Sequence, residues 1–155
     1  MVLEDRVPIE MSRDAANLDF DVLFESRRRN EILVRGLLGR MICDGALDPV
    51  SATALTEIAG GVAVRHVFPR RYVIDRGGDP DSILNLMIIA ATAAKRYGEQ
   101  LPGVFLQGEN PWDRRALESQ HCDVATLERD AYGDFIASRA KAIFTMVQRA
   151  TVEPR

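Results

Sequence analysis

Apolar residues recur every three to four positions in two long stretches of this chain, and this spacing predicts two long helices. The first stretch runs from about 20 to 44, and the second runs from 131 to 150, where Asp130 can cap the helix. Residues 1–19 follow no steady period and are expected to form an extended N-terminal arm. One domain over residues 20–152 is then long enough to bury a single core.

Two short apolar runs between these helices contain the β-branched and aromatic residues that strands favour. We expect the first strand at 62–68, where Pro69 ends it, and the second at 84–89. The segment 76–81 contains two glycines and Pro80 and is expected to form the loop between the strands.

The other segments are expected to be short or irregular. Ser51 can cap a short helix to about Ala59, and Thr92 opens another that runs to about Tyr97. Residues 103–125 show few periodic apolar positions and are expected to be loops and turns. This order of elements favours an α+β fold, but the pattern alone is equally compatible with a helical domain that has one incidental hairpin.

Charge is informative here by its distribution rather than by its sum. A net charge of −3 argues against a protein that coats nucleic acid by bulk charge. Within residues 65–96, however, six bases stand against three aspartates, enough for a local phosphate-binding face. A solvated surface explains the same bases equally well. The DNA-binding candidates are Arg65, Arg70, Arg71, Lys95 and Arg96.

Hydropathy argues against a membrane protein. No apolar run approaches the roughly 18–20 residues that a membrane-spanning helix needs. The N-terminus is acidic and lacks the basic and apolar regions of a signal peptide, so a cytoplasmic location is expected.

Two polar residues in the predicted hairpin are candidates for chemistry. His66 lies at the end of the first strand, where a histidine is either structural or an acid–base group. Asn85 lies inside the apolar second strand, and a buried amide without partners costs roughly 1–3 kcal/mol. Its structural alternative is to bridge the backbone of the hairpin loop.

Five segments in one collinear order over residues 30–150 resemble the C-terminal HNH (His-Me finger) nuclease domain of GmrSD-like restriction and phage-defence proteins. In chain order, they are 38–52 (similar to the family's "GAkDw.tG"), 64–69 ("HHIFP"), 82–89 ("sIaNlvll"), 90–102 ("saeTNrkIsnkxP"), and His121 with 130–143 ("HLIp…y..FleaRaelI"). The resemblance implies a ββα-metal finger, a hairpin followed by a helix, flanked by long N- and C-terminal helices.

The resemblance also implies a chemistry, the metal-dependent cleavage of DNA. In the family a histidine takes a proton from water, an asparagine orients that histidine, and one divalent ion binds the scissile phosphate. Position by position, His66 matches the base and Asn85 the orienting asparagine, so their side chains are expected within a few ångströms of each other.

The two positions that hold the ion in the family carry other residues here. Arg65 replaces a His or Asp ligand and Ala94 replaces an Asn or His, and neither side chain can coordinate a cation. Mg²⁺ or another divalent ion is therefore expected to bind weakly or not at all, and any ligand set is unknown beyond carboxylates such as Asp75 or Asp79. Arg65 is expected to point at the phosphate site. Whether Ala94 is natural or engineered stays open.

Three functions follow as hypotheses. The chain is a DNA endonuclease domain of a restriction or phage-defence system with a degenerate metal site, an inactive pseudonuclease that binds DNA or a partner module, or a helical protein-interaction domain. Full-length relatives carry an N-terminal ParB-like sensor domain, which makes such a domain or chain a candidate partner. The chain is expected to be either an excised C-terminal domain or a stand-alone remnant.

Overall fold

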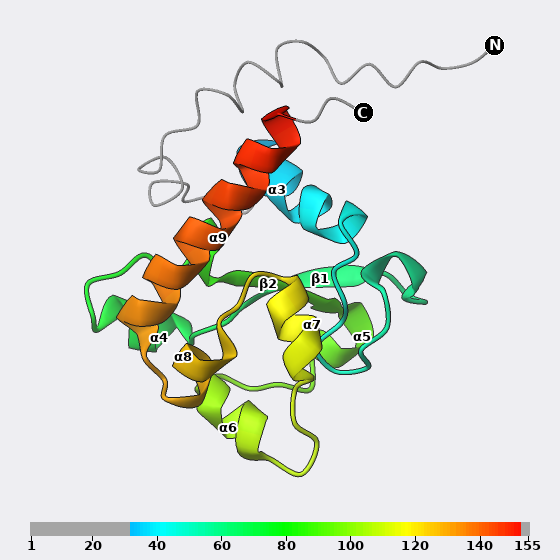
Figure 1. Cartoon of the computed structure of the whole chain (residues 1–155). Coiled ribbons are helices and arrows are strands. Elements are labelled where there is room, and N and C mark those ends of the chain that lie inside the picture. The colour runs from blue at the N-terminus through cyan, green and yellow to red at the C-terminus, as the bar shows by residue number, and fades with distance from the viewer. Residues whose placement is uncertain (1–31, 153–155) are drawn as a thin grey trace, which may run out of the picture.

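The centre of the fold is a two-stranded antiparallel sheet, seen in a computed structural model that describes residues 32–152 (Figure 1). Strand β1 (Val62–His66) pairs with β2 (Leu86–Ala90), in a register that places His66 opposite Leu86. Both predicted strands are present. The second begins later than expected because residues Ile83–Asn85 form a 3₁₀ turn, η2, and the Ser82 hydroxyl accepts a hydrogen bond from its backbone.

Two long helices cover one face of this sheet, α3 (Ile32–Cys43) and α9 (Tyr132–Val152) (Figure 1). Both match predicted helices where the structure describes them. The arm at 1–19 and the first part of the predicted N-terminal helix, 20–31, lie outside the described residues. The core on this face consists of Val34, Leu37, Leu38, Met41, Ala46, Leu55, Ile83, Leu84, Leu86, Ile88, Ala140, Ile143, Met146 and Val147.

Short helices cover the opposite face, and here the loop predicted for 103–125 is wrong. This segment contains α6 (Pro102–Gln107), α7 (Arg114–Ser119) and the start of α8 (Val124–Glu128). Each is only one or two turns long, so none shows a measurable apolar period. Aspartates at the N-caps of α7 and α8 accept backbone hydrogen bonds and define where those two helices begin.

Because both faces of the sheet are covered, every residue of β2 is buried. Leu86 and Ile88 pack toward α3 and α9, whereas Met87 and Ile89 pack into a second core. That second core also contains Val67, Phe68, Val73, Ala90, Ala93, Phe105, Leu106, Trp112, Leu117, Cys122, Val124, Leu127 and Phe135.

The helix predicted from Ser51 to Ala59 is also wrong. The Asp48 carboxylate accepts hydrogen bonds from the backbone N–H and the hydroxyl of Ser51, so these groups form a turn instead of a cap. Ala52 has a φ of 55°, which is incompatible with a right-handed helix. Only the 3₁₀ turn η1 (Leu55–Glu57) remains of the predicted element.

The hairpin is followed by α5 (Ala91–Ala94), a single turn that contacts both strands and is shorter than the helix predicted to Tyr97. Helix α4 (Arg70–Ile74), which was not predicted, lies directly after β1. The fold is therefore α+β. Helix α4 and the turn η2 lie between the two strands in chain order, and the ββα-metal finger stays a prediction. Within residues 32–152, no helix has the length and apolar character needed to cross a membrane.

Candidate functional site

The candidate site is a cleft of about 250 Å³ at the end of β1, between the start of α4 and the segment that follows α5. Four residues singled out from the sequence line it: Arg65, His66, Arg70 and Ala94. The full lining is Val64, Arg65, His66, Val67, Pro69, Arg70, Ala94, Tyr97, Gly98, Glu99 and Gln100. The hairpin and α5 thus bring together the predicted base and the two positions that the resemblance matches to metal ligands.

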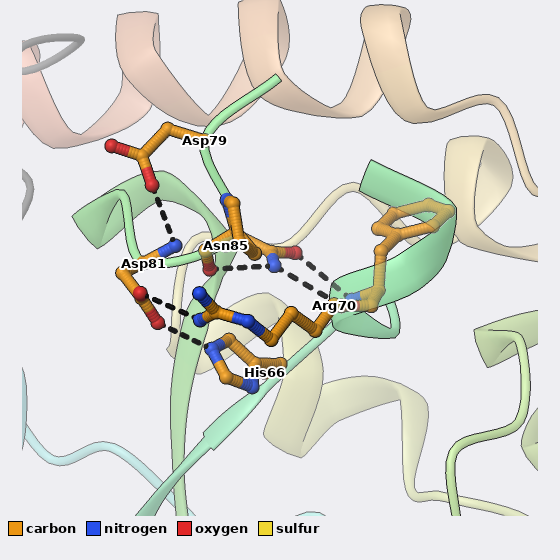
Figure 2. A network of polar contacts seen from close by, with 7 residues as sticks. His66, Arg70, Asp79, Asp81 and Asn85 are labelled. Atoms are coloured by element: carbon orange, nitrogen blue, oxygen red, sulfur yellow. Dashed lines mark hydrogen bonds and ion pairs between the residues drawn. The ribbon is translucent and has the colours of Figure 1, made fainter. Parts of the chain in front are cut away.

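His66, the last residue of β1, is held by a carboxylate from the hairpin loop. Its Nε2 lies 2.9 Å from Oδ1 of Asp81 (Figure 2). An ionised carboxylate can only accept hydrogen bonds, so His66 Nε2 is the donor. A neutral His66 then has its accepting lone pair on Nδ1, which is the state required of a general base.

Arg70, at the start of α4, binds the other oxygen of the same carboxylate. Its Nη1 lies 2.7 Å from Oδ2 of Asp81, and its side chain is about half exposed. The hydrogen bonds from Arg70 and then from His66 hold the pKa of Asp81 below its ordinary value. Asp81 is therefore ionised at neutral pH, and it links an imidazole to a guanidinium.

Asp81 was not predicted from the sequence. Asp75 and Asp79 were the carboxylates expected as possible metal ligands, but loop residues follow no period, and nothing in the sequence pairs position 81 with position 66. Asp79 instead contributes to the loop, where its Oδ1 accepts a hydrogen bond of 3.0 Å from the backbone N–H of Asp81.

Asn85 is fully buried, and its amide bridges the backbone of the hairpin. The side-chain oxygen accepts a hydrogen bond of 2.9 Å from Phe68 N–H. The side-chain nitrogen donates to the carbonyls of Phe68, at 3.1 Å, and Pro80, at 3.0 Å. Asn85 lies in the turn η2 and not inside the second strand as expected, but its amide has the backbone-bridging role that burial requires. Direct orientation of His66 by Asn85 stays a prediction.

Arg65 lines the cleft but is held by groups of the protein itself, and its contact with a bound phosphate stays a prediction. Its Nη1 and Nη2 each donate a hydrogen bond of 2.7 Å, to the carbonyls of Tyr97 and Gly98. Its guanidinium carbon lies 5.4, 5.3 and 6.0 Å from the ring centroids of Tyr97, Phe105 and Trp112. Burial of the guanidinium among these groups removes it from water and lowers the pKa of Arg65. The side chain fastens the segment after α5 to the sheet.

The remaining basic candidates lie outside the cleft lining. Arg71 is exposed and pairs with Asp75, with its Nε 3.1 Å from Oδ1. Lys95 and Arg96 are exposed immediately after α5. Their roles in DNA binding stay predictions, and Arg70 is the basic residue whose charge lies beside His66.

The residues at the family's metal positions do not fit a divalent ion. Arg65 donates to carbonyls and Ala94 offers only a methyl group. The carboxylates considered as substitutes are engaged elsewhere, Asp75 with Arg71 and Asp79 with the backbone of Asp81. Across residues 32–152, no three His, Cys, Asp or Glu side chains gather where they could hold a metal.

Comparison of the chain with protein-family models, with curated proteins and with solved structures finds no match. Two chemical groups of the cleft suggest what it can do. These are an imidazole oriented by a carboxylate, which can exchange a proton, and a guanidinium at the mouth, which can bind an oxyanion.

Proposed function

We propose that this chain is an HNH-type DNA endonuclease domain of a restriction or phage-defence system whose metal site has degenerated, so that it binds DNA better than it cuts it. One observation carries the proposal. His66, Arg65 and Ala94, which match the base and two metal-ligand positions of the family, come from β1 and α5 to line a single cleft.

The groups in the cleft suit binding more than cleavage. A backbone phosphate at the mouth can accept two hydrogen bonds from the Arg70 guanidinium, and His66 can exchange a proton with water beside it. A guanidinium has no open coordination position, so it neither activates water nor stabilises a leaving oxygen as a divalent ion does. Slow cleavage is the expected consequence.

DNA binding tests the first half of the proposal. We expect salt-sensitive binding of a fluorescent duplex, and Arg70→Gln should weaken it and reduce the slope of log affinity against log salt by about one. Arg149→Gln, the same charge change near the end of α9 in the opposite helical layer, is the matched control and should have little effect. Binding that is insensitive to salt, or equal losses in both variants, would contradict a site at the cleft.

Cleavage tests the second half. In a plasmid-nicking assay with Mg²⁺ or Mn²⁺, we expect weak nicking by the unmodified chain. Robust metal-dependent nicking that His66→Ala abolishes would mean that the chain has a working metal site. The proposal that the metal site has degenerated would then be wrong.

A pseudonuclease that binds DNA or a partner module without any cleavage is the second candidate function. The engagement of Arg65 with the carbonyls of Tyr97 and Gly98 favours it, because that guanidinium keeps the metal-ligand position from being used. DNA binding with no nicking under any metal condition would support this candidate over the first. A ParB-like sensor domain as the partner stays a prediction.

A further inference from the structure

The contact between His66 and the hairpin loop assigns a role to a residue that the family resemblance does not identify. We propose that Asp81 is the positioning residue of His66, and that the buried Asn85 acts on His66 only indirectly, by fixing the loop that carries Asp81. The inference rests on the proposed function, in which His66 is the acid–base group of the cleft.

The loop is built to hold the Asp81 carboxylate in place. Asn85 donates a 3.0 Å hydrogen bond to the carbonyl of Pro80, the residue directly before Asp81. Asp79 accepts a 3.0 Å hydrogen bond from the backbone N–H of Asp81 itself. Figure 2 shows the resulting arrangement, in which the Asp81 carboxylate faces both His66 and Arg70.

The two oxygens of the carboxylate have different partners. Oδ1 accepts from His66 Nε2 at 2.9 Å, and Oδ2 accepts from Arg70 Nη1 at 2.7 Å. The carboxylate favours the protonated imidazole, whereas the guanidinium competes for the carboxylate and disfavours a second positive charge beside it. Replacing Asp81 and replacing Arg70 should therefore shift the pKa of the His66 imidazole in opposite directions.

The experiment reads the imidazole of the free protein directly. The chain contains only two histidines, so ¹⁵N-histidine NMR gives two rings, and a His121→Asn variant assigns them. Asn is chosen because position 121 has a φ of 61°, which Asn tolerates. Neutral His66 is expected as the Nε2–H tautomer.

We expect the pKa of His66 to fall by about half a pH unit or more in Asp81→Asn and to rise in Arg70→Gln. Asn is close in size to Asp, and it removes the charge and replaces one accepting oxygen by an NH2 group. The control is Glu99→Gln, which removes a carboxylate from the lining of the same cleft and should change the His66 pKa by less than half as much. Retention of the wild-type NMR dispersion shows that each variant is folded.

The Nδ1–H tautomer in the unmodified chain would overturn the proposal, as would an Asp81→Asn effect no larger than that of Glu99→Gln, or effects of the same sign in Asp81→Asn and Arg70→Gln. The spectra need no DNA, so they separate this inference from the proposed function. If the expected changes occur but the duplex does not bind, the positioning role stands and the DNA-binding function fails.

Discussion

At the scale of single residues, the sequence was most informative where burial forces an outcome. An amide inside an apolar run needs partners, so a backbone-bridging Asn85 was foreseeable. The structure gives its amide three partners, although Asn85 lies in the turn η2 and not in the strand. His66 was a candidate because it ends a predicted strand and matches the base position of the resemblance. Its partner Asp81 was not, because the contact joins a strand end to a loop that follows no period.

Asn85 should contribute strongly to stability. In Asn85→Ala, the N–H and carbonyl of Phe68 and the carbonyl of Pro80 lose their partner, with the Phe68 groups buried. We expect the free energy of unfolding to fall by about 3 kcal/mol or more, measured by urea denaturation. Asn110→Ala, at an exposed loop position, is the control and should cost less than about 0.5 kcal/mol. Similar losses in the two variants would mean that the amide bridge contributes little.

At the scale of elements, side chains from two connecting segments hydrogen-bond to the edge of β2, as the backbone of a third strand would in a larger sheet. Gln120, the C-cap residue of α7, accepts from Ile88 N–H at 2.8 Å and donates to its carbonyl at 2.7 Å. The Asp48 carboxylate accepts from Ala90 N–H at 2.8 Å. The outer edge of β2 is thus satisfied without a strand. The sequence could not predict this, because it depends on where one- and two-turn helices are placed.

Replacement of Gln120 tests this edge. Gln120→Leu introduces an apolar side chain of similar size that cannot form hydrogen bonds. It leaves the N–H and carbonyl of Ile88, and the carbonyl of Leu47, without their partner. We expect a loss of about 2–4 kcal/mol in the free energy of unfolding. The same substitution at the exposed Gln148 of α9 should stay within about 0.5 kcal/mol of wild type. Faster hydrogen exchange of the Ile88 amide in Gln120→Leu than in wild type would show that the destabilisation lies at β2.

At the scale of the whole molecule, the two apolar stripes and the hairpin between them favoured the α+β fold that the structure has, although the pattern alone was equally compatible with a helical domain. The continuous apolar run of β2 reflects helices on both of its faces. The helical layer at 102–128 was missed because its helices are too short for periodicity. The partners of Arg65 were not predicted for a related reason: the aromatic residues around it come from segments 32 to 47 positions later.

This placement of Arg65 sets stability against activity in any attempt to restore a metal site. Ala94→Asn adds an amide at a half-buried position of the cleft and should recover little nicking, because Arg65 still occupies the other ligand position. Arg65→His frees that position but removes two hydrogen bonds to carbonyls and the contacts with three aromatic rings, at a cost of about 1–3 kcal/mol. The double variant should therefore nick DNA in Mn²⁺ more than either single variant while melting at a lower temperature than wild type. Thermal denaturation and plasmid nicking measure the two effects separately. Full nicking by the Ala94→Asn variant alone would contradict the prediction. It would mean that Arg65 does not obstruct the ion and that the absence of an asparagine at position 94 alone explains the low nicking activity.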